Sequence, residues 1–154
     1  LMTGFRKGEF DIVLVKRDPE KVKGGTKVWR EPLIWAAAEH YKLKEDIPLV
    51  LSPQPCIYRA RALTALDRMR KSWHISYTSP SLAGTIAAVK AGLGITVLPA
   101  TMVPQGLSPL KGTLKLPHLA DSEIALMKKE NLSQAGKVLA AHIVSSLEQN
   151  VQHQ

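Results

Sequence analysis

Cysteine, aromatic residues and long apolar runs are all scarce in this chain of 154 residues, and each scarcity excludes a class of protein. The single cysteine, Cys56, cannot form an internal disulfide, which favours a reducing compartment. Aromatic residues make up only 5% of the chain, too few for a platform that stacks single-stranded nucleic acid. No apolar run could span a bilayer, and the first residues lack the apolar core of a secretory signal, so we expect a cytoplasmic protein with no membrane partner.

Motifs for catalysis, metal binding and nucleotide binding are also missing. The five histidines, at positions 40, 74, 118, 142 and 153, have no metal-ligand spacing with one another or with Cys56. No phosphate-binding loop occurs, and the glycines of residues 92–94 precede a predicted strand, which argues against a dinucleotide site. The sequence therefore predicts a protein that is not an enzyme and that has no metal and no cofactor.

The net charge of +8 at pH 7 invites a nucleic-acid interpretation. The basic residues are dispersed along the chain, however, and some stand in the last turn of a predicted helix, where the helix dipole favours them. We therefore favour a solvated basic surface over a nucleic-acid site in this chain.

Residues 77–99 carry the most informative pattern: a polar turn, an apolar helix, a glycine stop at Gly92 and a buried strand at 93–98. Ser79 and Ser81 both belong to the residue types that cap helices, and the sequence does not decide which one is the N-cap. Hydroxyls and unpaired N–H groups at a helix N-terminus can hold a small anion. The alternative is an ordinary crossover between parallel strands with no ligand.

A second polar corner, residues 52–59, stands between a predicted strand at 49–51 and a predicted helix at 56–69. Open parallel sheets bind ligands at such corners, so two helix N-termini could converge on one carboxylate or similar group. Arg59 could add a charge-assisted pair, although an outward, solvated arginine is the favoured alternative. Tyr58 either lines the cleft or packs against its lobe.

Cys56 begins this second helix, and a helix N-terminus favours the thiolate form of a cysteine. Such a thiolate could be a nucleophile or a redox sensor. No histidine accompanies Cys56 in a recognisable motif, so we favour a small, buried and unreactive residue. A thiol-dependent enzyme or redox switch remains an alternative function.

The rest of the pattern predicts further elements. Strands are expected at residues 10–15, 33–38, 73–78 and 122–128, a surface loop at 18–26 and irregular chain at 100–121. A closing helix is expected at 133–149 with Ser133 as its cap. Its predicted inner face consists of Val138, Leu139, His142, Ile143 and Leu147, with His142 as a hydrogen-bonded core residue.

Four segments follow one another in a recognisable order: GEFDIVLV at 8–15, EPLIWAAAEH at 31–40, PLVLSPQP at 48–55 and VKAGLGITVLP at 89–99. The last of these matches the pattern V-x-x-G-x-G-I/V-x-x-x-P. In order and approximate spacing, the four segments resemble the C-terminal effector-binding (substrate-binding) domain of LysR-type transcriptional regulators.

The resemblance implies an α/β protein with a two-lobe periplasmic-binding-protein-like (type II) fold and mixed, mostly parallel sheets. We expect residues 1–40 to form a partial first lobe (regulatory subdomain I), residues 41–120 the second lobe (regulatory subdomain II), and residues 121–154 to return to the first lobe. The family's opening strands have no counterpart here, so we expect a fragment of a longer regulator with a truncated first lobe. Unpartnered sheet edges in such a lobe predict self-association.

The resemblance also implies a function: a small, anionic effector binds between the two lobes and shifts their relative placement. The regulator would be a homo-oligomer, a dimer or tetramer, and would bind DNA through the missing N-terminal winged helix-turn-helix. The family's site carries over to Pro53, Gln54, Cys56, Thr78, Ser79 and Ser81, to which the residue pattern adds Tyr58 and Arg59. A periplasmic-type solute-binding protein, which shares the two-lobe arrangement, is the alternative.

Overall fold

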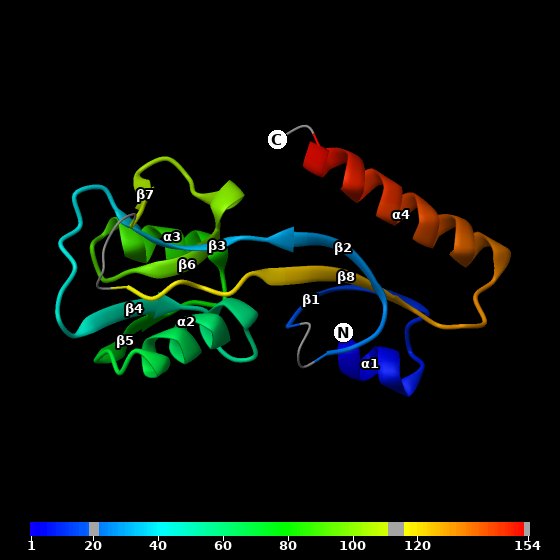
Figure 1. Cartoon of the computed structure of the whole chain (residues 1–154), viewed down its shortest axis with the longest axis horizontal. Coiled ribbons are helices and arrows are strands. Elements are labelled where there is room, and N and C mark those ends of the chain that lie inside the picture. Colours follow the sequence, from blue (N-terminus) through cyan, green and yellow to red (C-terminus); the bar gives the residue numbers. More distant parts are fainter. Residues whose placement is uncertain (19–21, 111–115, 153–154) are drawn as a thin grey trace. The chain divides into compact units, whose positions relative to one another are not determined.

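The chain divides into two compact units in a computed structural model that describes residues 1–18, 22–110 and 116–152. Unit 1 comprises Leu1–Glu31 and Ser122–Gln154, and unit 2 comprises Pro32–Asp121 (Figure 1). The chain therefore leaves unit 1 after Glu31 and returns to it at Ser122. Parts of the predicted loop at 18–26 and of the irregular stretch at 100–121 lie outside the described residues.

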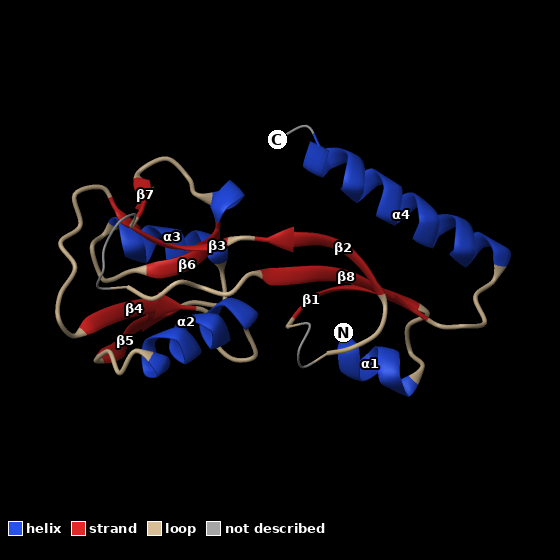
Figure 2. Ribbon diagram, viewed as in Figure 1, coloured by secondary structure: helices blue, strands red, loops and turns tan. Residues whose placement is uncertain are grey.

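Unit 1 is built on a three-stranded antiparallel sheet in the order β1-β8-β2 (Figure 2). The strands are β1 (Ile12–Arg17), β2 (Thr26–Glu31) and β8 (Ser122–Lys128). Side chains alternate along β8, so Ile124 and Leu126 face one side of the sheet and Met127 faces the other. Helix α4 (Gln134–Gln152) covers the first side and helix α1 (Met2–Lys7) covers the second.

Helix α4 packs on the sheet through a face that overlaps the predicted one at Ile143 and Leu147 but not at Val138, Leu139 and His142. Ser133 caps it as expected, because its Oγ accepts a hydrogen bond from Gly136 N at 3.1 Å. The residues that pack on the sheet are Ala140, Ile143, Val144 and Leu147. Val138 and Leu139 are 61% and 52% exposed, and His142 is exposed rather than a core residue. Both candidate faces have helical spacing, so periodicity alone could not choose between them.

The strands of unit 2 form two sheets, one in the order β6-β3-β7 and one that pairs β4 with β5. They are β3 (Leu33–Ala38), β4 (Ile47–Leu51), β5 (Trp73–Thr78), β6 (Thr96–Pro99) and β7 (Leu107–Pro109). β5 and β4 are parallel, and a parallel bridge between Leu49 and Ile95 joins β4 to the start of β6. β3 is antiparallel to both β6 and β7. Most of the named strand pairs are antiparallel, whereas mostly parallel sheets were predicted. The reason is that β3 and β8 each run antiparallel to both of their neighbours.

Helices α2 (Ile57–Arg68) and α3 (Leu82–Lys90) cover opposite faces of the β4 strand. Leu49 belongs to the apolar cluster that includes residues of α2, whereas the next residue, Val50, belongs to the cluster that includes Val89 of α3. Successive residues of a strand point to opposite faces, which accounts for this division. β4 is consequently buried on both sides, as its apolar sequence predicts.

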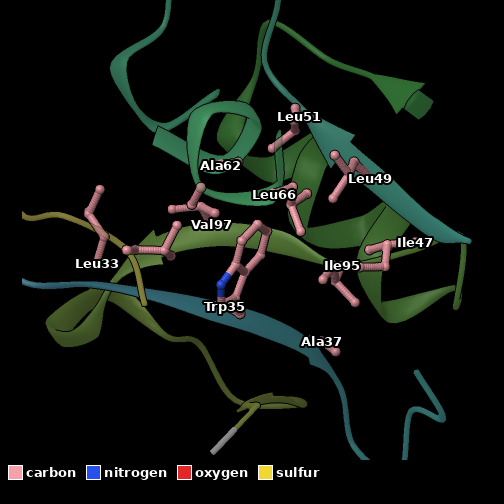
Figure 3. Close-up of a cluster of buried hydrophobic side chains, with 12 residues drawn as sticks. Leu33, Trp35, Ala37, Ile47, Leu49, Leu51, Ala62, Leu66, Ile95 and Val97 are labelled. Carbon is pink, nitrogen blue, oxygen red and sulfur yellow. The ribbon is translucent and has the colours of Figure 1, made fainter. Parts of the chain in front are cut away.

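Trp35 lies within the cluster on the α2 side of unit 2 (Figure 3). Its ring packs with residues such as Leu66, which is fully buried, and its Nε1 donates a hydrogen bond to Pro117 O at 2.8 Å. Each apolar side chain buried in this way contributes roughly 1.5–3 kcal/mol to folding. The hydrogen bond also ties the chain near Pro117 to β3, so the segment that leads back to unit 1 is part of this core.

Two glycines explain the motif at the end of α3. Gly92 has φ +77° and ends the helix, with Leu93 N donating to Ala88 O at 3.1 Å. A side chain at Gly94 would clash with the carbonyl oxygen of Pro48, because the chain entering β6 runs close against β4.

In the described part of the chain, no helix has the length and apolar character needed to cross a membrane.

Candidate functional site

The two polar corners that the sequence singles out lie at one edge of unit 2. β4 and β5 are parallel neighbours, and Leu51 and Thr78 are their last paired residues. The chain runs from Leu51 into residues 52–56 and from Thr78 into residues 79–81. Ser79 N donates a hydrogen bond to Leu51 O at 3.3 Å, which ties the two corners together. The structure therefore places the predicted site residues side by side at the carboxyl ends of two strands.

The connections from these two strands diverge. The chain from β4 enters α2 on one face of the sheet, and the chain from β5 enters α3 on the other face. In open α/β sheets, ligands bind where neighbouring connections leave to opposite faces, outside the carboxyl ends of the strands. The corners occupy the corresponding position in unit 2.

Ser79 and Ser81 build the second corner with their own side chains. Ser81 is the N-cap of α3, and its Oγ accepts a hydrogen bond from Gly84 N at 3.2 Å. Ser79 is buried, and its Oγ accepts from Ser81 N at 3.2 Å and donates to Ser81 O at 3.1 Å. Both hydroxyls thus hold the turn in shape, whereas the side chain of Thr78 is exposed at its start.

The first corner leaves the start of α2 without a side-chain cap. Cys56 is the half-buried N-cap, its backbone is extended, and its side chain makes no capping hydrogen bond. Pro53 and Gln54 before it are exposed, and the Gln54–Pro55 peptide bond is cis. The first N–H groups of a helix have no partner within the helix, so an uncapped first turn can donate to an anion.

Arg59 and Tyr58 differ in how they relate to this corner. Arg59 is half-buried and donates from Nη1 to Ser52 O at 3.2 Å, so the prediction of an outward, solvated side chain is wrong. Its Nε is buried, with no hydrogen-bond partner among the described residues. Tyr58 packs against the apolar cluster on the α2 side of the sheet. The corner therefore combines a guanidinium with helix N–H groups, donors that suit a carboxylate or another small anion.

The perturbed titratable groups of unit 2 stand away from the two corners. Hydrogen bonds from Ser72 and His74 hold the pKa of Asp46 below its ordinary value, with Ser72 Oγ 2.6 Å from Asp46 Oδ1. Asp46 and His74 lie at the amino ends of β4 and β5, the opposite edge of the sheet. Burial raises the pKa of Tyr41. Within the ranges that the structure describes, no three His, Cys, Asp or Glu residues are grouped to hold a metal ion.

Arg61 is a residue of this region that sequence reasoning does not single out. It lies on α2, and its Nη2 donates a hydrogen bond to Asp121 O at 3.1 Å. The two residues are 60 positions apart, and the acceptor is a backbone carbonyl, so no local pattern could have paired them.

Residues 1–147 match the family described as LysR substrate binding domain. Over 125 residues, the chain is 31% identical to the HTH-type transcriptional regulator PecT of Dickeya dadantii (strain 3937). That match covers 80% of this chain and 39% of PecT. The chain therefore spans less than half the length of this curated relative.

Solved structures share the fold at low sequence identity. The regulatory domain of HypT from Salmonella typhimurium, in its apo form, matches with a TM-score of 0.78 and 16% identity, covering 97% of this chain and 78% of that one. The same domain with bromide bound has a TM-score of 0.77, with 17% identity and coverage of 97% and 77%. The Synechocystis PCC6803 CcmR regulatory domain in complex with 2-PG has a TM-score of 0.74, 16% identity and coverage of 96% and 78%.

Proposed function

The chain belongs to the LysR substrate-binding domain family, and from this we propose that it is the effector-sensing and oligomerising domain of a LysR-type DNA-binding transcriptional regulator. The match over residues 1–147 confirms the resemblance, and the likeness to HypT confirms the α/β, two-lobe periplasmic-binding-protein-like (type II) fold class. The chain spans only part of PecT, so DNA binding through an N-terminal winged helix-turn-helix is proposed for the whole protein.

The proposed effector is a small anion held at the two corners of unit 2. The observation that carries this proposal is that β4 and β5 end side by side and lead into helices on opposite faces. Each helix offers the positive end of its dipole there, and only α3 has a side-chain cap. Bromide in HypT and 2-PG in CcmR are ligands found in regulatory domains of this fold, which supports a small effector here.

The proposed site residues divide into two groups. Ser79 and Ser81 act by shaping the turn, because their hydroxyls are bonded to the backbone. Thr78 and Arg59, together with the N–H groups of the first turn of α2, would contact the anion. Pro53, Gln54, Cys56 and Tyr58 would border it.

Support for a regulator over the alternatives comes from the relatives. PecT is an HTH-type transcriptional regulator. A cytoplasmic location and homo-oligomerisation remain predictions, and a redox switch at Cys56 remains the alternative function. The exposed apolar residues Val138 and Leu139 of α4 support self-association, because water-exposed apolar surface is removed when copies associate.

Titration of the chain with sodium bromide and with 2-PG, at an ionic strength held constant with sodium chloride, tests the anion site. We expect saturable changes in amide NMR shifts at residues 52–59 and 78–84. Thr78→Val should weaken binding about tenfold, the value of one hydrogen bond to a charged group. Thr64→Val, which alters an exposed threonine in the middle of α2, is the matched control and should change nothing. Shifts that are scattered and do not saturate would instead indicate weak, unspecific association of anions with the basic surface.

A further inference from the structure

We propose that Arg61 is a positioning residue that couples the start of α2 to the point where the chain returns from unit 2 to unit 1. This inference rests on the proposed function, because it concerns how occupation of the α2 corner reaches the rest of the protein. Its structural basis is a chain of contacts within unit 2 and a second set within unit 1.

The first contact is the hydrogen bond from Arg61 Nη2 to Asp121 O, at 3.1 Å. Arg61 lies five residues after the N-cap Cys56, which is about 7.5 Å along the helix axis. One rigid helix therefore carries both the first turn at the candidate anion site and the donor that holds Asp121. Asp121 is the last residue of unit 2 before the chain returns.

The chain before Asp121 is also fixed to the same core. Leu119 is 2% exposed and belongs to the apolar cluster that contains Ala62 and Leu66 of α2. Pro117 O accepts the hydrogen bond from Trp35 Nε1. A displacement of α2 thus carries the returning segment with it, because close-packed side chains transmit strain.

On the other side of the crossing, Ser122 is fixed within unit 1. Its side chain is fully buried, and its Oγ donates to Glu31 Oε2 at 2.8 Å. The same two residues are paired in the ladder between β2 and β8. A single peptide bond therefore separates Asp121, which α2 holds, from Ser122, which unit 1 holds.

A different contact holds the chain where it leaves unit 1, between Glu31 and Pro32. Pro32 O accepts a hydrogen bond from Ala100 N at 2.9 Å, so the hydrogen bond at this residue comes from the 3-10 helix η1 (Ala100–Met102). The next residue, Leu33, lies in the same apolar cluster as Ala62 and Leu66, so a movement of α2 reaches this crossing through packing, whereas it reaches the return crossing through the Arg61 hydrogen bond as well. Arg61 is the side chain that supplies this direct hydrogen bond from α2.

The test is a double-mutant cycle that needs no ligand. Cys56→Asp introduces an N-cap that perturbs the first turn of α2, and Arg61→Met removes the bond to Asp121. The readout is the backbone ¹⁵N shift of Ser122, whose peptide group contains the Asp121 carbonyl. We expect the effect of Cys56→Asp at Ser122 to fall by about half or more in the Arg61→Met background, because linked residues are not additive.

Two further variants separate positioning from simple stabilisation. Arg61→Lys keeps a donor and should restore part of the coupling, whereas Arg68→Met changes an exposed arginine on the same helix and should leave it intact. Additive effects of Cys56→Asp and Arg61→Met at Ser122 would overturn the proposal.

Bromide titration of the same proteins distinguishes this inference from the proposed function. In the wild type, bromide should shift amides at residues 52–59 and also at Ser122, and Arg61→Met should keep the first response and lose most of the second. A missing response at residues 52–59 alongside a non-additive cycle would overturn the anion site and leave the coupling supported. A response at Ser122 that survives in Arg61→Met would overturn the coupling alone.

Discussion

Arg17 and Glu123 form an ion pair that is almost completely buried. Their side chains are 9% and 8% exposed, and Glu123 Oε1 lies 2.5 Å from Arg17 Nη2 and 2.8 Å from Nε. Arg17 also donates to Gly24 O. A buried charge is tolerated only while its partner is present, since water cannot solvate the remaining ion.

Glu123→Gln should therefore lower the free energy of unfolding by about 3–5 kcal/mol, because it leaves the Arg17 guanidinium buried without a counter-charge. Urea denaturation measures the change. Asp11→Asn is the matched control: it breaks an ion pair with Lys129 of 2.6 Å whose side chains are 70% and 36% exposed. That loss should stay below about 1 kcal/mol, and equal losses in the two variants would contradict the argument from burial.

Single-residue roles could be predicted from the sequence only where the physics is local. Ser79 and Ser81 were identifiable as cap residues because capping involves neighbours within a few positions, although geometry was needed to choose Ser81. Arg17 looked like part of a dispersed basic surface, because its partner Glu123 is 106 residues away. Arg59 looked solvated because its acceptor is a backbone carbonyl, which has no sequence signature.

At the scale of elements, the two glycines after α3 make different demands on the chain. Gly94→Ala should cost about 3 kcal/mol, because the new methyl group meets the Pro48 carbonyl and pushes the start of β6 away from β4. Gly92→Ala should lower the free energy of unfolding by only about 1 kcal/mol. Its φ of +77° disfavours alanine, but the new methyl group would meet no neighbouring atom within 4 Å. Thermal and urea unfolding of the two variants measure the difference. A smaller loss for Gly94→Ala would show that the sheet can relax at this position.

Elements with a clear internal pattern were predictable, and their pairing was not. The strands at 73–78 and 122–128 have the bounds that the sequence predicts. β7 has three residues, too few for any periodicity, so it fell within the stretch predicted as irregular. The partners of β3 are β6 and β7, and pairing between strands that far apart depends on packing that local sequence does not contain.

At the scale of the whole molecule, the sequence placed the return to unit 1 at residue 121, one residue from its position at Ser122, but misplaced the departure from unit 1. A polar stretch at residues 39–46 suggested a crossing near residue 40, whereas the structure groups residues 32–40 with unit 2. The reason is β3, whose Trp35 and Ala36 are buried between elements of unit 2. The assignment of the units to regulatory subdomains I and II remains a prediction.

Unit 2 is a continuous segment with its own buried clusters, so residues 32–121 should fold as an independent polypeptide. Its amide NMR spectrum should reproduce the peaks that the same residues give in the whole chain. Residues 41–121 are the matched control: they lack β3, and with it Trp35, so they should give the collapsed, poorly dispersed spectrum of a chain without a unique core. Equal spectra for the two polypeptides would contradict the boundary at Glu31. They would place β3 outside the cooperative unit that carries the proposed anion site.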